Sequence, residues 1–145
     1  METIKNETMN KKEIDLNISY KFINDNFILY INITNFSNKE KRFYFLNNTG
    51  GLARNGINLF NVMHEKLIAY EKTFISPVYN EEEINADVLL PNENKQFELS
   101  ASVLKENNNL ILFFKGISFK ITKGEKFYIT FDFLDTTSNM LEVVI

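Results

Sequence analysis

The sequence predicts an all-β fold, a single antiparallel β-sandwich, and three observations support this prediction. Apolar and polar residues alternate with a period of two along most of the chain, most clearly at Phe127, Ile129, Phe131 and Phe133, which share one face. Turn signals interrupt these runs about every 8–12 residues, a spacing typical of sandwiches and barrels. The 145 residues include 14 Phe and 6 Tyr, which supply enough apolar mass for one core.

The first half of the chain is predicted to form strands after a polar N-terminal tail. Residues 1–12 are expected to be this flexible tail, so that a single sandwich domain would span 13–145. The strands are expected at 14–20, 27–34, 42–46, 57–63 and 67–70. The second of them is apolar on both faces in its first half, which indicates a central strand. Asn-rich turns would connect them, and residues 64–66 would form a hairpin turn.

The second half is predicted to be equally rich in strands. Residues 73–79 are expected to be extended, with Pro77 confining this stretch to a sheet edge or ending it. Residues 80–85 hold three consecutive Glu and are the best candidate for a short helical turn. Beyond an apolar stretch at 88–90, strands are expected at 97–103, 110–114, 117–121, 126–134 and 140–145.

Composition excludes several classes of function. The chain has no Cys, which rules out disulfides, thiol catalysis, Cys-based zinc sites and iron–sulfur ligation. Its net charge is −3 and it has no basic stripe, so we expect no binding to nucleic acid. No apolar run approaches the roughly 20 residues of a membrane span. The polar N-terminus lacks a signal region, which indicates a cytoplasmic protein, or a periplasmic or secreted one whose signal peptide has been removed.

Motifs for catalysis and metal binding are incomplete. His64 begins a stretch like the zinc-protease motif, but that motif needs a second His at position 68, which is Ile. His64 is therefore interpreted as an exposed turn residue. The acidic run 81–83 could bind calcium or a basic partner, although a solvated loop is the simpler interpretation. Asp132 and Asp135 are not expected to reach a catalytic separation. We assign no catalytic, metal-binding or cofactor-binding residue and expect no enzyme.

Aromatic residues offer a second kind of candidate surface. Most Phe residues fall on the apolar faces of their strands and are interpreted as core. Tyr30, Tyr44, Tyr79 and Tyr128 are better candidates for exposed rings. Tyr44 and Tyr128 lie on faces opposite their neighbouring Phe residues, so they would form a binding patch if those faces belonged to one sheet.

The middle of the chain resembles a known family. Residues 49–52 (Thr-Gly-Gly-Leu) and 59–70 (Leu-Phe-Asn-Val-Met-His-Glu-Lys-Leu-Ile-Ala-Tyr) are similar to the Ig-like N-terminal, proregion-type domain of deuterolysin-like metalloproteases. Residues 89–93 would match that family's apolar residue followed by Pro-Gly-Glu. Gly50 stands where the family has Pro, and Asn92 where it has Gly. The pattern, over roughly residues 25–105, is also similar to the small Ig-like intracellular proteinase-inhibitor domains of bacteria.

This resemblance implies a non-catalytic, Ig-like binding module. The fold expected for the whole chain is an Ig-like sandwich with at most one short helix. The module's partner would be another protein, either a protease or a subunit of a bacterial assembly such as a secretion apparatus or toxin complex. A carbohydrate- or lipid-binding sandwich is a further alternative. Contacts are expected from two loops, one with glycines for unusual backbone geometry and one joining Pro, Tyr and carboxylates. The candidate partner-binding residues are Thr49, Gly50, Gly51, Leu52, Arg54, Pro77, Tyr79, Glu81, Glu82 and Glu83.

Overall fold

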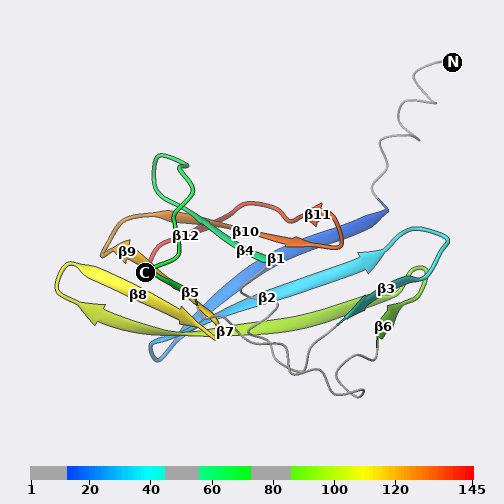
Figure 1. Cartoon of the computed structure of the whole chain (residues 1–145), viewed down its shortest axis with the longest axis horizontal. Helices are drawn as coiled ribbons and strands as arrows, with labels where there is room; N and C mark the ends of the chain where they lie inside the picture. Colours follow the sequence, from blue (N-terminus) through cyan, green and yellow to red (C-terminus); the bar gives the residue numbers. More distant parts are fainter. Residues whose placement is uncertain (1–12, 45–55, 73–85) are drawn as a thin grey trace, which may run out of the picture.

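The computed structural model describes residues 13–44, 56–72 and 86–145, and within them the chain is an all-β sandwich of antiparallel strands, as predicted (Figure 1). The described strands are β1 (Ile14–Ile23), β2 (Asn26–Asn35), β3 (Lys41–Tyr44), β4 (Ile57–Phe60), β5 (Glu71–Lys72), β6 (Ala86–Leu89), β7 (Asn94–Glu106), β8 (Asn109–Phe114), β9 (Ile117–Thr122), β10 (Phe127–Phe133), β11 (Thr136–Thr137) and β12 (Leu141–Val143). The predicted tail 1–12 and the helix candidate 80–85 lie outside the described residues.

The larger sheet has six strands in the order β1-β2-β7-β8-β9-β5. β2 pairs with β1 on one side and β7 on the other, which confirms that it is a central strand. The β1–β2 turn consists of Asn24 and Asp25, both with positive φ (49° and 63°). This backbone geometry matches the right-handed twist of the two strands and favours a two-residue hairpin. Gly116, with φ 93°, is the second residue of the two-residue turn between β8 and β9.

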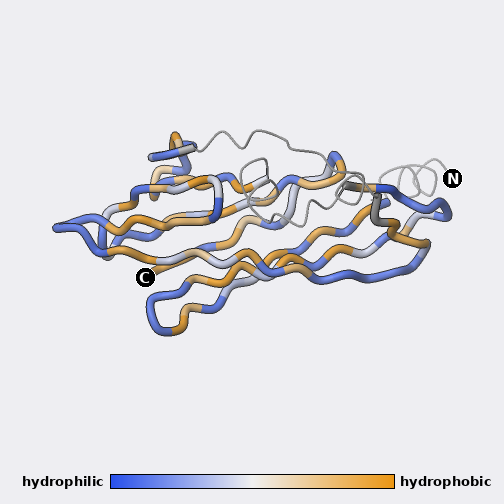
Figure 2. The backbone as a smooth tube through the Cα atoms, turned by 60° about the horizontal axis from the view of Figure 1, so that its bottom comes forward, coloured by the Kyte–Doolittle hydropathy of each residue, from blue (hydrophilic) through white to orange (hydrophobic). Residues whose placement is uncertain are grey.

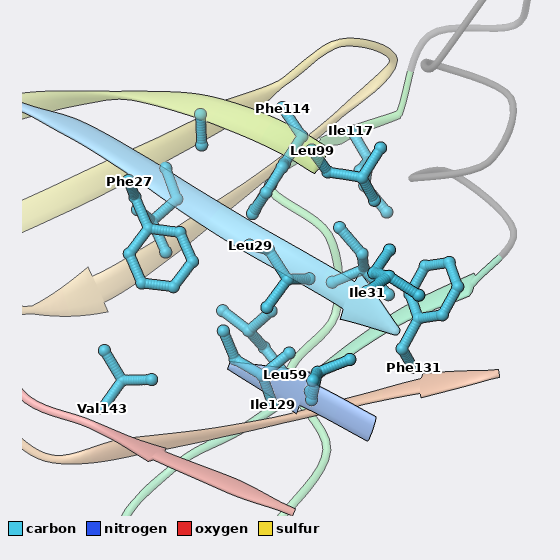
Figure 3. Packing of buried hydrophobic residues seen from close by; sticks show 14 of the residues in the cluster. Phe27, Leu29, Ile31, Leu59, Leu99, Phe114, Ile117, Ile129, Phe131 and Val143 are labelled. Carbon is cyan, nitrogen blue, oxygen red and sulfur yellow. The ribbon is translucent and has the colours of Figure 1, made fainter. Parts of the chain in front are cut away.

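The smaller sheet is built around β10. β4 pairs with one side of β10, while β12 and β11 pair in succession with the other side. Figure 3 shows the contact between the two sheets, where Leu29 and Ile31 of β2 face Leu59, Ile129 and Phe131 of the smaller sheet. All of these side chains are buried. Figure 2 shows why one face of each strand is buried: hydrophobic and hydrophilic residues alternate along the strands.

A two-stranded ladder of β3 and β6 covers one end of this core. Phe43 of β3 is buried there and packs edge to face against Phe97 and Phe133, with ring centroids 6.1 and 5.3 Å apart. Phe133 thereby joins the core at its end, which confirms that the apolar face of β10 points inward along its length. Edge-to-face rings of this kind add a favourable electrostatic contact to the buried area.

The two sheets are also joined at both of their lateral edges. On one side, the side chain of Asn139 binds the backbone of Ile18 in β1: the Ile18 N–H donates to Oδ1 at 2.7 Å and Nδ2 donates to the Ile18 carbonyl at 3.2 Å. On the other side, the chain leaving β4 bonds first to Leu59 and then to Ser118 of β9. The sandwich is therefore tied together by hydrogen bonds as well as by its core.

Some predicted boundaries were wrong. The strand expected at 57–63 ends at Phe60, and residues 67–70 form no regular strand. The short strands β5 and β11 were not predicted, because two residues are too few to show alternation. Phe22, Phe36 and Phe113 are exposed rather than part of the core.

Candidate protein-binding surface

The β4–β5 connection, residues 61–70, presents apolar side chains to solvent. Ile68 is 93% exposed and Met63 74%, while Val62 and Tyr70 are 48% and 47% exposed. Figure 1 shows this segment, in green, projecting away from the smaller sheet. Single exposed apolar residues are ordinary on protein surfaces, but four within nine residues of one connection mark it as a candidate interaction surface.

Asn61 fixes the first half of this connection. Its Oδ1 accepts hydrogen bonds from the N–H groups of Met63 and Glu65, both at 2.9 Å. The backbone adds two more bonds, from the Asn61 N–H to the Glu65 carbonyl and from the His64 N–H to the Asn61 carbonyl. Asn favours such turns because its side chain can replace a backbone acceptor. The four bonds end β4 and aim Met63 at solvent.

His64 anchors the turn to the smaller sheet. Its ring stacks on Tyr128 of β10, with centroids 4.2 Å apart and planes inclined by 22°. His64 lies in an exposed turn, as predicted, with a φ of 62°. Tyr128 therefore supports the turn instead of standing free. The patch proposed for Tyr44 and Tyr128 does not form on one sheet, since β3 pairs with β6 and not with β10.

The second half of the connection is tied to both sheets. Lys66 forms a bridge with Phe60, and the Leu67 N–H donates to the Leu59 carbonyl at 2.8 Å. The Tyr70 N–H then donates to the carbonyl of Ser118 at 2.8 Å. Because backbone bonds hold both ends, the side chains alternate: Leu67 and Ala69 pack against the core, and Ile68 and Tyr70 point outward.

Charges around this surface are balanced. Lys126 and Glu142 form an ion pair at 2.6 Å, and Glu142 is the direct cross-strand neighbour of Tyr128. The hydrogen bond from Lys126 to Glu142 raises the pKa of Lys126. Lys120 lies over the ring of Tyr70, with its Nζ 5.5 Å from the centroid. The surface therefore offers apolar contacts, and the charges around it do not produce an electrostatic potential of a single sign.

A groove lies at the N-terminal end of β1 and offers weaker chemistry. It is an open groove of about 660 Å³ whose lining includes Glu13, Glu40, Lys41, Arg42 and Asp135. Lys41 and Glu13 form an ion pair at 2.9 Å, and its hydrogen bond lowers the pKa of Glu13. Arg42 also pairs with Glu40, at 3.5 Å, so that ion pairs neutralise most of the charge in the groove.

Asp132 and Asp135, the acidic pair in the sequence analysis, lie in β10 and in the turn that follows it. The Asp132 carboxylate accepts hydrogen bonds from Asn58 at 2.8 Å and Thr137 at 2.7 Å. Asp135 lies in the following turn with a φ of 57°. Within the described part of the chain, no three His, Asp or Glu side chains are grouped closely enough to hold a metal ion. The same residues contain no helix long and apolar enough to cross a membrane.

The loop residues predicted to bind a partner cannot be placed, because all ten lie in 45–55 or 73–85, outside the described residues. The β4–β5 connection was not among them, although the family resemblance runs through it. One signal was present: residues 67–70 are apolar at every position, so that both faces of this segment carry apolar side chains. Neither a protein-family model nor a curated protein matches the chain.

Proposed function

We propose that this chain is a non-enzymatic, Ig-like protein-binding module that uses a loop held on a rigid sandwich. The observation that supports this proposal is the β4–β5 connection, where exposed apolar side chains are carried by a hydrogen-bonded backbone. An ordered loop loses little conformational entropy on binding, so that more of the contact energy contributes to affinity.

The apolar residues of the connection are suited to the centre of an interface. Ile68 and Met63 project furthest, and burying an aliphatic side chain contributes about 1.5–3 kcal/mol. Tyr70, with Lys120 over its ring, joins an apolar face to a polar tip, a combination common at binding sites. We expect a partner with an apolar pocket and little net charge around it.

The partner class follows from the family resemblance. Residues 59–70 carry the longest part of that resemblance and include the whole connection. A protease is therefore the first partner to test. A subunit of a bacterial assembly is the alternative.

The test compares two substitutions, each of which replaces an exposed aliphatic residue by Asp. Proteins captured from the source organism by the wild-type chain would be identified by mass spectrometry, and the affinity of the purified partner measured by calorimetry. Ile68→Asp should weaken binding at least tenfold, since about 1.4 kcal/mol corresponds to that factor. Leu90→Asp is the matched control, because Leu90 is 51% exposed in the turn after β6. Equal affinities of the wild type and Ile68→Asp would refute the proposed surface.

A panel of bacterial proteases adds a functional measurement. If the partner is a protease, the wild-type chain should inhibit or bind one member of the panel, and Ile68→Asp should lose that effect with an unchanged circular dichroism spectrum. Inhibition that persists in Ile68→Asp but disappears when residues 50–54 are replaced would assign the contact to the sequence-predicted loop instead.

A further inference from the structure

The outer edge of β1 carries backbone groups that no described residue pairs. Both the N–H and the carbonyl of Ile18 bond to Asn139, so they point away from β2. In an antiparallel ladder this direction repeats at every second residue. The N–H and carbonyl groups of Tyr20 and Phe22 therefore also point outward, toward the open side of the sheet.

The side chains at this edge leave an apolar face incompletely covered. Tyr20 and Phe22 lie on the same face of β1 as the buried Ile18. Tyr20 stacks on the fully buried Phe27, with ring centroids 5.3 Å apart. Phe22 is nevertheless 38% exposed, and its neighbour Ile23 is 39% exposed. An additional strand beside β1 would extend the core over Tyr20 and Phe22.

Protection against strand pairing differs between the two halves of this edge. The side chain of Asn139 bonds to the N–H and the carbonyl of Ile18, as a neighbouring strand would. From Tyr20 to Ile23 there is no Pro and no bulge in the pairing with β2, although proteins commonly use these devices to block open edges. Only Lys21 provides a charge, on the solvent-facing side of the strand.

Lys21 argues against a second copy of this chain as the occupant. A two-fold pairing that uses both outward residues sets Tyr20 opposite Phe22 of the copy, which places Lys21 directly opposite the same residue. Like charges in that position destabilise a sheet. A pairing centred on Tyr20 would need the Ile18 groups that Asn139 already uses. A pairing centred on Phe22 would need the backbone groups of Asn24, which lies in the β1–β2 turn with a φ of 49°.

We propose that the edge of β1 from Tyr20 to Phe22 binds an extended segment of another protein as an added antiparallel strand. The segment carries a carboxylate opposite Lys21 and apolar side chains opposite Tyr20 and Phe22. The carboxylate side chain lies in a non-hydrogen-bonded pair with Lys21, where cross-strand side chains approach most closely. Backbone bonds supply affinity in this mode of recognition, and the alternate side chains supply specificity. This site is separate from the β4–β5 connection and does not depend on it.

The experiment uses two capped peptides and the full chain. One peptide has the sequence Thr-Val-Glu-Val-Thr and the other Thr-Val-Lys-Val-Thr, and each is titrated into the ¹⁵N-labelled protein. With the Glu peptide, amide shifts should change along β1, and hydrogen exchange at Tyr20 and Phe22 should slow, while exchange at Ile18 stays the same. The Lys peptide should bind at least tenfold more weakly. Lys21→Glu should reverse this preference.

Two substitutions at one position separate the backbone from the side chain. Phe22→Pro removes an outward N–H without removing a bond to β2, so it should weaken the Glu peptide more than Phe22→Ala does. Lys21→Glu and Phe22→Ala keep the test decisive if Phe22→Pro does not fold. The proposal is overturned if the Glu peptide gives no shifts on β1 at about 1 mM, the weak end of specific binding. Equal binding of both peptides, or shifts confined to residues 61–70, would also overturn it.

Discussion

Several asparagine side chains in this protein form hydrogen bonds with backbone groups that would otherwise pair with other backbone groups. Asn61 accepts two N–H groups of its own turn, a local pattern that sequence alone can suggest. Asn139 instead bonds to Ile18, 121 positions away in the chain. No spacing rule links these two residues, so sequence reasoning could not find the contact. The richness of the chain in Asn indicated turns, whereas the structure also gives Asn residues roles in joining distant elements.

Asn35 offers the clearest prediction at the scale of one residue. It is fully buried, and its Nδ2 donates to the carbonyls of Lys39 and Leu89 while its Oδ1 accepts from the N–H and hydroxyl of Ser37. Asn35→Ala would remove the donor to the buried carbonyl of Leu89 and the bonds to Lys39 and Ser37. We expect it to lower the free energy of unfolding by about 2–4 kcal/mol in urea denaturation.

The matched control for Asn35 is an asparagine on the surface. Asn17→Ala removes an exposed side chain that bonds only to Asp15, and should change stability by no more than about 0.5 kcal/mol. Similar losses in the two variants would show that the buried hydrogen bonds of Asn35 do not hold this end of the sandwich.

At the scale of elements, alternation located most strands but not the connections. It ended β1 three residues too early and placed both ends of β7 three residues short. Strands β2, β8, β9 and β10 lie within two residues of their predicted ends, because each has a buried face and a solvated face or two buried faces. β4 ended early because hydrogen bonds to Asn61 compete with the ladder, although Val62 and Met63 continue the apolar pattern. The candidate surface was missed for this reason, since its apolar residues were assigned to strands.

The order of the β4–β5 connection depends on Asn61, and this gives the prediction at the element scale. Asn61→Ala removes the acceptor for the N–H groups of Met63 and Glu65. Hydrogen exchange at these two amides should accelerate about tenfold, the equivalent of one hydrogen bond of roughly 1.4 kcal/mol. Exchange at Leu67 should not change, because its N–H bonds to Leu59.

The same variant tests whether order in the connection matters for binding. All of the exposed apolar side chains remain in Asn61→Ala, yet the partner should bind more weakly because the loop must be ordered on contact. Unchanged affinity together with faster exchange would mean that the apolar side chains bind without the preformed turn.

At the scale of the whole molecule, the two sheets are held by a shared core and by two lateral connections of different kinds. The side near β9 is closed by a continuous segment of chain, which bonds through its own backbone. The side near β1 is closed at Ile18 by a side chain from a connection of the smaller sheet. This second closure stops short of Tyr20, and the unpaired edge proposed as a binding site begins where it ends.

Asn139 should therefore affect both global stability and the β1 edge. Asn139→Ala removes both bonds to Ile18, but water can reach this partly exposed position, so we expect a loss of only about 1–2 kcal/mol in the free energy of unfolding. Hydrogen exchange at Ile18 should become as fast as at Tyr20, because the free edge would then include both residues.

Gln96→Ala, on the exposed face of β7, is the control and should leave stability and exchange at Ile18 unchanged. Slow exchange at Ile18 in Asn139→Ala would mean that the sheets stay closed at this edge through core packing alone. The unpaired segment of β1 would then not be limited by Asn139.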